Sequence, residues 1–220
     1  MREQAGIGAS LLMRLRSMLL GWGCVGLVYG LSSAWQGKGV VLPETALDRL
    51  IVFNPAGLWL YLSFFVFIPY TFLRVDASRL LWLRISMQTC ALLCGVVFLL
   101  WPTTLVYPDY AAYLATSGTG LGASLLRLLL WGDSAQNCLP SLHAALTLLC
   151  AWALLDRRRP LRSALAIVAA LCICFSVIQL RRHLSLDVGT GLAAGLASGT
   201  LCRAALLRRG WIPAGKESPT

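Results

Sequence analysis

The sequence predicts an all-α, polytopic bundle of membrane helices, and three observations favour this fold class. Hydrophobic residues make up 58% of the 220 residues and charged residues only 13%, which is about half the charged fraction of a soluble domain. The apolar residues gather in six runs that each approach the ~20 residues needed to cross a bilayer. Basic residues lie in short clusters between these runs, so the net charge of +10 does not indicate a nucleic-acid-binding face.

The expected helices follow the apolar runs in chain order. They cover about residues 18–35, 56–73, 85–101, 139–155, 161–180 and 185–207. The fourth run is the shortest, so its helix can begin within the headgroup region. The first run is longer than the apolar part of a signal peptide and no small-residue cleavage site follows it, so we expect it to be retained. The predicted membrane domain is 18–207, with 1–17 as an N-terminal segment and 208–220 as a tail.

The basic residues predict the orientation. If the N-terminus is cytoplasmic, 14 basic residues fall inside and 5 outside, in agreement with the positive-inside rule. The inside residues are Arg2, Arg14, Arg16, Arg74, Arg79, Arg84, Arg157, Arg158, Arg159, Arg162, Arg203, Arg208, Arg209 and Lys216. The outside residues are Lys38, Arg49, Arg127, Arg181 and Arg182. Both termini are then cytoplasmic, and the compact, arginine-rich chain is typical of a bacterial inner-membrane protein whose outer face is periplasmic.

The outer loop of about residues 102–138 contains one more predicted element. Gly118–Gly122 is expected to be a flexible hinge, and the apolar stretch Ala123–Trp131 predicts a short helix along the membrane surface. The sequence leaves open whether this helix is a lid or a plain interfacial helix. The eight cysteines form neither a disulfide framework nor a zinc pattern. All but Cys138 lie in apolar runs, where they are interpreted as packing residues.

The chain has only two histidines, and both fall near the outer ends of predicted helices. His183 precedes Asp187 by four residues, a spacing that places two side chains on one helix face. A carboxylate that accepts the proton of one ring nitrogen leaves the other as a basic lone pair, as a nucleophilic histidine requires. The alternative is a buried His–Asp hydrogen bond that joins two helices.

His143 follows Pro140 and Ser141 at the start of the fourth run. Pro140 suits the first turn of a helix, and the free N–H groups of that turn, with the Ser141 hydroxyl, can seat a phosphate oxygen. His143 beside this seat can donate a proton to a leaving group, unless it is only an interfacial histidine behind a helix cap. Arg181 and Arg182 add planar donors that suit phosphate, unless they only contact lipid headgroups. Together these residues predict phosphoryl transfer without a metal or other cofactor.

The motifs Asn137-Cys-Leu-Pro-Ser-Leu-His143 and His183-Leu-Ser-Leu-Asp187 resemble the second and third signature motifs of the type-2 phosphatidic acid phosphatase superfamily. Pro-Ser-Leu-His, in place of Pro-Ser-Gly-His, is similar to the branch that includes inositol phosphorylceramide synthases and bacterial relatives. Asp133, Asn137 and the stretch from Leu47-Asp-Arg to Trp59-Leu-Tyr61-Leu-Ser63 also resemble that branch. The resemblance covers about residues 45–200.

The resemblance implies a six-helix core with a site at the outer membrane face. It implies that His183 attacks phosphorus to form a phosphohistidine, that Asp187 orients His183, and that His143 protonates the leaving oxygen. Water or an alcohol then accepts the transferred group.

The chain departs from the family's pattern in the residues that hold phosphate. It has no Lys-six-residues-Arg-Pro motif, and Val177 stands where an arginine usually precedes the histidine of the third motif. We therefore expect phosphate to be bound by Arg181 or Arg182, with Arg127 as a further candidate. Asn137 and Ser141 complete the predicted phosphate-binding set.

Three functions remain open at this point. The site either hydrolyses a membrane lipid phosphate or diphosphate, or transfers a lipid headgroup to an alcohol acceptor; both use the same chemistry. The remote alternative is a non-enzymatic protein in which His143 and His183 hold a b-type haem, a role that requires neither Pro-Ser-Leu-His nor flanking arginines. Zinc bound by both histidines and Asp187 is similarly disfavoured. A membrane lipid is thus the expected partner, without nucleic acid, while the particular lipid and the oligomeric state are not set by the sequence.

Overall fold

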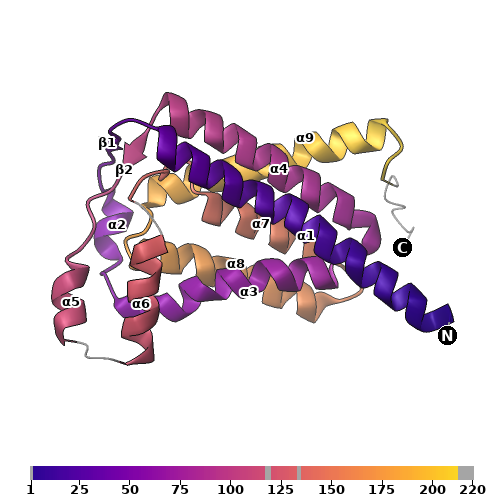
Figure 1. Cartoon of the computed structure of the whole chain (residues 1–220), viewed down its shortest axis with the longest axis horizontal. Helices are drawn as coiled ribbons and strands as arrows, with labels where there is room; N and C mark the ends of the chain where they lie inside the picture. Colours follow the sequence, from indigo (N-terminus) through magenta and orange to yellow (C-terminus); the bar gives the residue numbers. More distant parts are fainter. Residues whose placement is uncertain (1, 117–119, 133–134, 213–220) are drawn as a thin grey trace.

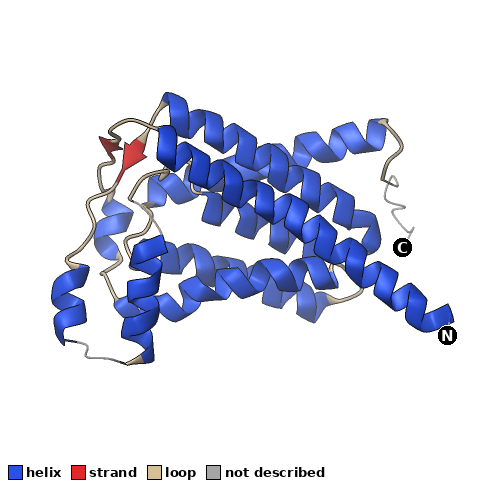
Figure 2. Cartoon of the chain, viewed as in Figure 1, coloured by secondary structure: helices blue, strands red, loops and turns tan. Residues whose placement is uncertain are grey.

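A computed structural model describes residues 2–116, 120–132 and 135–212, which form a bundle of α-helices (Figures 1 and 2). Its long helices are α1 (Arg2–Trp35), α3 (Leu58–Arg74), α4 (Ala77–Leu100), α8 (Pro160–Gln179) and α9 (Ser185–Arg208). The predicted all-α class is confirmed. Asp133, part of the expected glycine hinge and most of the expected tail lie outside the described residues.

Shorter elements gather at one end of the bundle. β1 (Val40–Val41) pairs in parallel with β2 (Thr103–Thr104). Nearby are α2 (Ala46–Leu50), the 3-10 turn η1 (Pro55–Gly57), α5 (Tyr110–Thr116) and α6 (Leu121–Gly132). Figure 1 shows α6 running across the direction of the long helices. The short helix predicted at Ala123–Trp131 is therefore confirmed, as α6.

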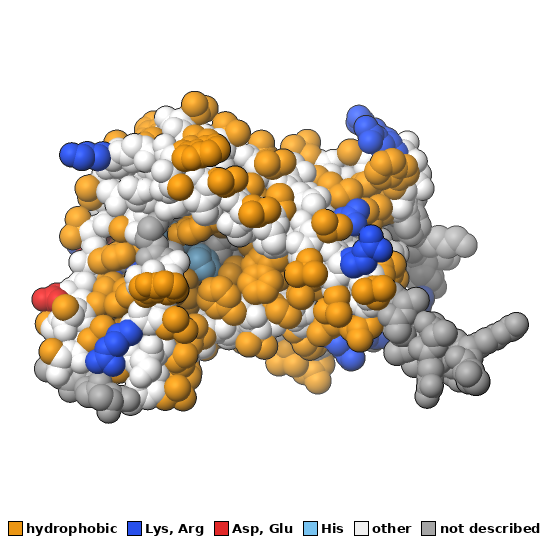
Figure 3. All heavy atoms as spheres, viewed as in Figure 1, with side chains coloured by type: hydrophobic (Ala, Val, Ile, Leu, Met, Phe, Trp, Pro, Cys, Tyr) orange, Lys and Arg blue, Asp and Glu red, His pale blue; other side chains and the backbone are white. Residues whose placement is uncertain are grey.

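Five helices among the described residues are long and apolar enough to cross a membrane. Their outward-facing side chains are largely hydrophobic, and Figure 3 shows these side chains spread over the flank of the bundle. Apolar surface on this scale is stable against lipid rather than water. The chain is thus an integral membrane protein.

The fourth predicted span is a short central helix, α7 (Leu142–Leu154). Its 13 residues extend about 20 Å at the ordinary helical rise, less than the ~30 Å of a bilayer core. Most of its side chains are buried, because α3, α4, α8 and α9 all pack against it. A helix enclosed by protein does not have to match the bilayer thickness, so a count of six spans stays a prediction.

Glycines on α9 allow α7 to approach closely. A Cβ atom at Gly191 would lie 2.2 Å from the Ser141 carbonyl oxygen, and one at Gly195 would lie 2.8 Å from the Ala145 carbonyl oxygen. Small residues permit this kind of close backbone contact between membrane helices. The contact fixes the start of α7 against the first turns of α9.

The bundle has two chemically different ends. The histidine end carries His143 and His183, and the arginine end carries Arg14, Arg79 and Arg162. Figure 1 shows that α1 begins and α9 ends at the arginine end. The assignment of this end to the cytoplasm stays a prediction.

Candidate functional site

His183 lies in the turn between α8 and α9. The carbonyl oxygen of Val177 accepts hydrogen bonds from the backbone N–H groups of Arg182 and His183, at 3.0 and 3.1 Å. The chain reverses at Arg181, which has a positive φ of 55°. Because α9 begins only at Ser185, the expectation that His183 and Asp187 share a helix face is wrong. The two side chains meet nevertheless, because the turn folds back over the start of the helix.

The side chain of Asp187 lies next to the ring of His183. Its Oδ2 atom is 3.4 Å from His183 Nδ1 and accepts a hydrogen bond from the Leu184 N–H at 2.8 Å. The Asp187 side chain is fully buried and His183 is nearly so. Within the described chain, neither His183 Nδ1 nor Asp187 Oδ1 has a hydrogen-bond partner. The carboxylate is therefore placed to accept a proton from His183 Nδ1 after a small adjustment, as is common in unliganded sites.

His143 lies in the first turn of α7, behind the N-cap residue Ser141. Pro140 precedes the N-cap, so its expected place in the first helical turn is wrong. The Ser141 hydroxyl accepts a hydrogen bond from the Ala144 N–H at 3.3 Å and is fully buried, so it caps the helix. The Ser141 N–H donates to the Asp187 carbonyl oxygen at 3.0 Å, which ties the two histidine motifs together.

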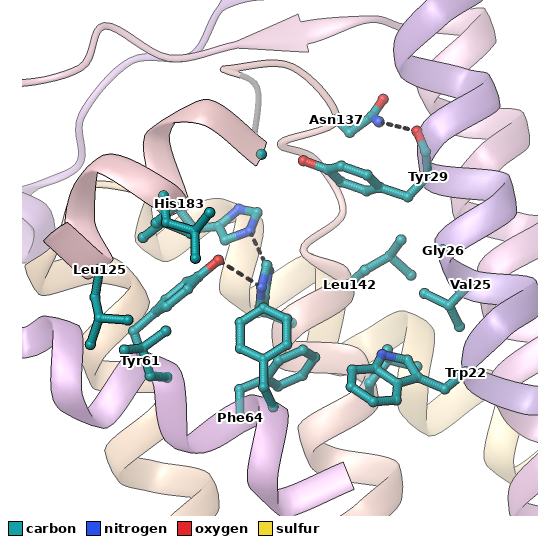
Figure 4. A pocket seen from close by; sticks show the side chains of 17 residues that line it. Trp22, Val25, Gly26, Tyr29, Tyr61, Phe64, Leu125, Asn137, Leu142 and His183 are labelled. Atoms are coloured by element: carbon teal, nitrogen blue, oxygen red, sulfur yellow. Dashed lines mark hydrogen bonds between the residues drawn. The ribbon is translucent and has the colours of Figure 1, made fainter. Parts of the chain in front are cut away.

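The structure brings both histidines and a tyrosine into one chain of contacts (Figure 4). His143 Nδ1 lies 3.3 Å from His183 Nε2, and the Tyr61 hydroxyl lies 3.0 Å from His143 Nε2. Tyr61 extends from α3 and is almost fully buried. Tyr61 belongs to the stretch whose sequence resembles the family, but the sequence alone did not predict a role for it. A tyrosine near the outer end of an apolar helix was the available signal, since a buried hydroxyl needs a partner.

A cavity of about 370 Å³ adjoins these residues. Side chains from α1, α3, α6 and α7 line it together with His183, and most of them are apolar or aromatic, such as Trp22, Phe65 and Leu128. Figure 3 shows a histidine in a hollow on the flank of the bundle. The cavity therefore opens towards the surface that faces lipid, with α6 at its border.

Asn137 lines the same cavity and connects it to α1. Its side chain donates to the Tyr29 carbonyl oxygen at 2.9 Å and accepts from Gln36 Nε2 at 2.8 Å. The residue is buried and has a positive φ of 58°. Its amide thus holds the loop before α7 against the end of α1.

The three predicted arginines point elsewhere. Arg181 donates to the carbonyl oxygens of Asp48 and Ile51 and pairs with Glu44 at 3.3 Å. Arg182 is buried with its guanidinium 4.3 Å from the centre of the Tyr107 ring. Arg127 is exposed on α6. Within the described residues, no arginine lines the cavity.

Asp48 on α2 is a second buried carboxylate near the site. It accepts hydrogen bonds from the backbone N–H of Ser185 at 2.7 Å and from the Thr45 hydroxyl at 2.8 Å. Burial acts to raise the pKa of Asp48, but the hydrogen bonds from Thr45 and Ser185 outweigh it, so the pKa is lowered. Asp48 thereby fixes the first residue of α9. In the sequence, Asp48 belongs to the stretch that resembles the family, and no role was predicted for it.

The N-termini of α7 and α9 meet at this site. Both helices present the positive ends of their dipoles to the region around the two histidines, an arrangement that stabilises anions. Among the described residues, no group of three or more His, Cys, Asp or Glu side chains is arranged to hold a metal ion. The geometry defines a histidine-based site for an anionic group at the edge of a membrane.

The fold and this pair of histidine motifs define a membrane phosphoesterase of the lipid phosphatase type. The family model of the PAP2 superfamily matches residues 56–201. The chain therefore belongs to the PAP2 superfamily, the type-2 phosphatidic acid phosphatases, and the predicted membership is confirmed. No curated protein and no solved structure matches the chain. The branch that includes inositol phosphorylceramide synthases stays a prediction.

Proposed function

We propose that this protein hydrolyses a phosphate, diphosphate or phosphodiester of a membrane lipid through a phosphohistidine on His183. The observation that carries the proposal is the 3.3 Å approach of His143 Nδ1 to His183 Nε2 beside a mostly apolar cavity. A direct hydrogen bond fits this distance, whereas two imidazole nitrogens on opposite sides of a haem iron lie about 4 Å apart. In the proposed orientation the site faces the periplasm of a bacterial inner membrane.

The proton positions follow from the neighbours of each ring. The Asp187 carboxylate favours a proton on His183 Nδ1, which leaves a lone pair on His183 Nε2. That lone pair accepts the Nδ1–H of His143, and His143 Nε2 then accepts the hydroxyl proton of Tyr61. A single arrangement of protons thus satisfies the contacts from Asp187 through His183 and His143 to Tyr61. In this arrangement, Nε2 is the nucleophilic atom of His183.

The reaction starts when a lipid phosphate replaces the direct contact between the histidines. His183 Nε2 forms a bond to phosphorus as the bond between phosphorus and the leaving oxygen breaks. His143, which takes up a proton from water at Nε2 as the anionic phosphate binds, gives its Nδ1 proton to that oxygen while its Nε2–H donates to the Tyr61 hydroxyl oxygen. Water then attacks phosphorus, His143 Nδ1 takes the water proton, and the bond to His183 breaks.

Phosphate binding is the least complete part of the site. The two helix N-termini supply a favourable field, and the amide of Asn137 and the hydroxyl of Ser141 lie near the histidines. We propose that Arg181 or Arg182 turns towards bound phosphate, with Arg127 approaching from α6. Arg182 directly precedes His183 in the sequence, and its guanidinium lies 4.3 Å from the centre of the Tyr107 ring.

The shape of the cavity supports a lipid substrate. Its apolar walls offer a path for acyl or isoprenyl chains, and its opening on the flank lets a lipid enter without crossing water. A phosphate attached to such a chain then comes to rest at the histidines.

Purified protein in detergent is supplied with labelled phosphatidic acid, a polyprenyl diphosphate or phosphatidylinositol, each with and without ceramide. We expect wild-type protein to release the phosphate-bearing group from at least one lipid irrespective of ceramide, and His183→Ala to release none. Release that requires ceramide, with transfer of the group to it, replaces hydrolysis by headgroup transfer. Equal release by wild type and His183→Ala contradicts both reactions at this site.

A further inference from the structure

A second cavity, of about 470 Å³, lies at the arginine end between α3 and α8. Its wall is apolar and includes Phe67, Leu165 and Ala169, while arginines occupy its rim. Arg74 ends α3 and Arg159 directly precedes α8, so the rim lies at the far end of these helices from the histidines. The proposed phosphoester chemistry does not use this cavity.

The arginines on the rim differ in how strongly they are held. Arg162 is anchored, because it donates to the Arg74 carbonyl oxygen at 3.2 Å and pairs with Asp156 at 3.4 Å, and its side chain is only 11% exposed. Arg159 makes a longer contact of 3.8 Å with Asp156 and is 57% exposed. Within the described chain, the exposed Arg74 guanidinium has no hydrogen bond or ion pair. Two guanidiniums are therefore available to an external anion.

The balance of charge around the cavity is positive. Three positive charges line the cavity, on Arg74, Arg159 and Arg162. Two carboxylates lie close to them, Asp156 and Asp76, and Asp76 is 4.0 Å from Arg162. The exposed residues Arg157 and Arg158 in the preceding turn add to the excess. A basic rim above an apolar wall matches an anionic headgroup attached to a hydrocarbon chain.

We propose that this groove binds an anionic glycerophospholipid from the leaflet at the arginine end. The lipid phosphate lies between Arg74 and Arg159, and one acyl chain follows the wall formed by Phe67, Leu165 and Ala169. A soluble phosphate would satisfy the rim but leave the apolar wall uncovered. The bound lipid joins α3, which carries Tyr61, to α8, which leads to His183.

The first test compares lipid retention in purified protein taken from nanodiscs of phosphatidylcholine with phosphatidylglycerol. Native mass spectrometry measures the lipid that remains bound to wild type, to Arg74→Gln/Arg159→Gln and to the control Arg203→Gln/Arg208→Gln. The control removes two exposed arginines of α9 at the same end. We expect the rim variant to lose affinity for phosphatidylglycerol by about fivefold per arginine and the control to match wild type.

The second test fills the groove without changing charge. Ala169→Phe places a ring on the apolar wall, and Ala164→Phe places the same ring on an exposed face of α8 outside the groove. We expect only Ala169→Phe to displace phosphatidylglycerol. Equal retention in these two variants, or equal loss in both double-arginine variants, overturns the proposal. Because retention is measured without turnover, the result does not depend on the function proposed for the histidines.

Discussion

The two ends of the bundle use opposite charges for a common physical reason. At the arginine end, Arg14 donates to the carbonyl oxygens of Phe72 and Val75 at the end of α3, and Arg79 donates to those of Ala153 and Leu155 at the end of α7. At the histidine end, carboxylates accept N–H groups at the start of α9, as Asp48 does from Ser185. Cations stabilise helix C-termini and anions stabilise helix N-termini.

The two ends differ in which buried polar atoms lack hydrogen-bond partners. Among the described residues of the arginine end, Arg162 Nε is buried without a hydrogen-bond partner, but the guanidinium is held by Asp156 and the Arg74 carbonyl oxygen. At the histidine end, His183 Nδ1 and Asp187 Oδ1 are both buried without hydrogen-bond partners in one adjacent pair of side chains. A buried polar group without a partner costs about 1–3 kcal/mol, a cost consistent with a site prepared for a ligand. The arginines at one end therefore stabilise the folded bundle, whereas His183 and Asp187 at the other end are expected to contribute to catalysis. Variants matched between the two ends test this difference.

The largest effect is expected for His183→Ala. Removal of the nucleophile should lower kcat by about 10⁴-fold or more, while the thermal unfolding transition in detergent stays close to that of wild type. The matched variant Arg208→Gln at the arginine end should keep wild-type turnover. If His183→Ala turns over lipid as fast as Arg208→Gln, the nucleophile has been assigned to the wrong residue.

His143→Ala should be next in size, and its effect should depend on the leaving group. The loss of a general acid costs about 10²–10⁴-fold for an alkyl phosphate, which has a poor leaving group, and much less for an aryl phosphate. Rates for a short alkyl phosphate and for p-nitrophenyl phosphate measure this difference. An equal loss for both substrates contradicts the acid role of His143.

Tyr61→Phe should reduce turnover by roughly tenfold, because one hydrogen bond that holds the His143 ring is lost. Tyr70→Phe removes a hydroxyl from an exposed position on the same helix and is the control. Turnover of Tyr61→Phe equal to that of Tyr70→Phe would restrict Tyr61 to a packing role.

Asp48→Asn should have the smallest effect on rate but should destabilise the protein by about 1.5–3 kcal/mol. Because the pKa of Asp48 is lowered in the folded protein, its stabilising contribution is present above the ordinary carboxyl pKa and is lost as pH falls through the lowered value. Thermal unfolding from pH 7 towards pH 3 measures this contribution. Asp76→Asn, at the half-exposed carboxylate of the arginine end, should change little; equal shifts in both variants would remove the special role of Asp48.

The long helices and the approach of the two histidine motifs could be predicted because each depends on a local pattern. Apolar runs of membrane length mark the helices, and only two histidines are present. The start of each helix was harder to predict. Pro140 suggested that the first helical turn includes Pro140, but Ser141 is the N-cap and α7 begins at Leu142. The spacing of His183 and Asp187 suggested a shared helix face, but His183 lies in the turn before α9.

Side-chain partners formed by distant segments could not be predicted from sequence. The hydroxyl of Tyr61 meets His143 across 82 positions, and Asp48 meets Ser185 across 137. The directions of Arg181 and Arg182 depend on the carbonyl oxygens of α2 and on the ring of Tyr107. These contacts depend on how distant segments pack together, and no repeating pattern in the sequence predicts them.

Mapping of a trapped intermediate tests the nucleophile assignment most directly. Wild-type protein is mixed with phosphatidic acid labelled in its phosphate, or with the most active lipid found, and is quenched in base within one turnover before peptide mass spectrometry. We expect label on His183, at Nε2, and none in His183→Ala. Label on another residue, label on Nδ1 of His183, or rapid turnover without any labelled protein would contradict the assignment.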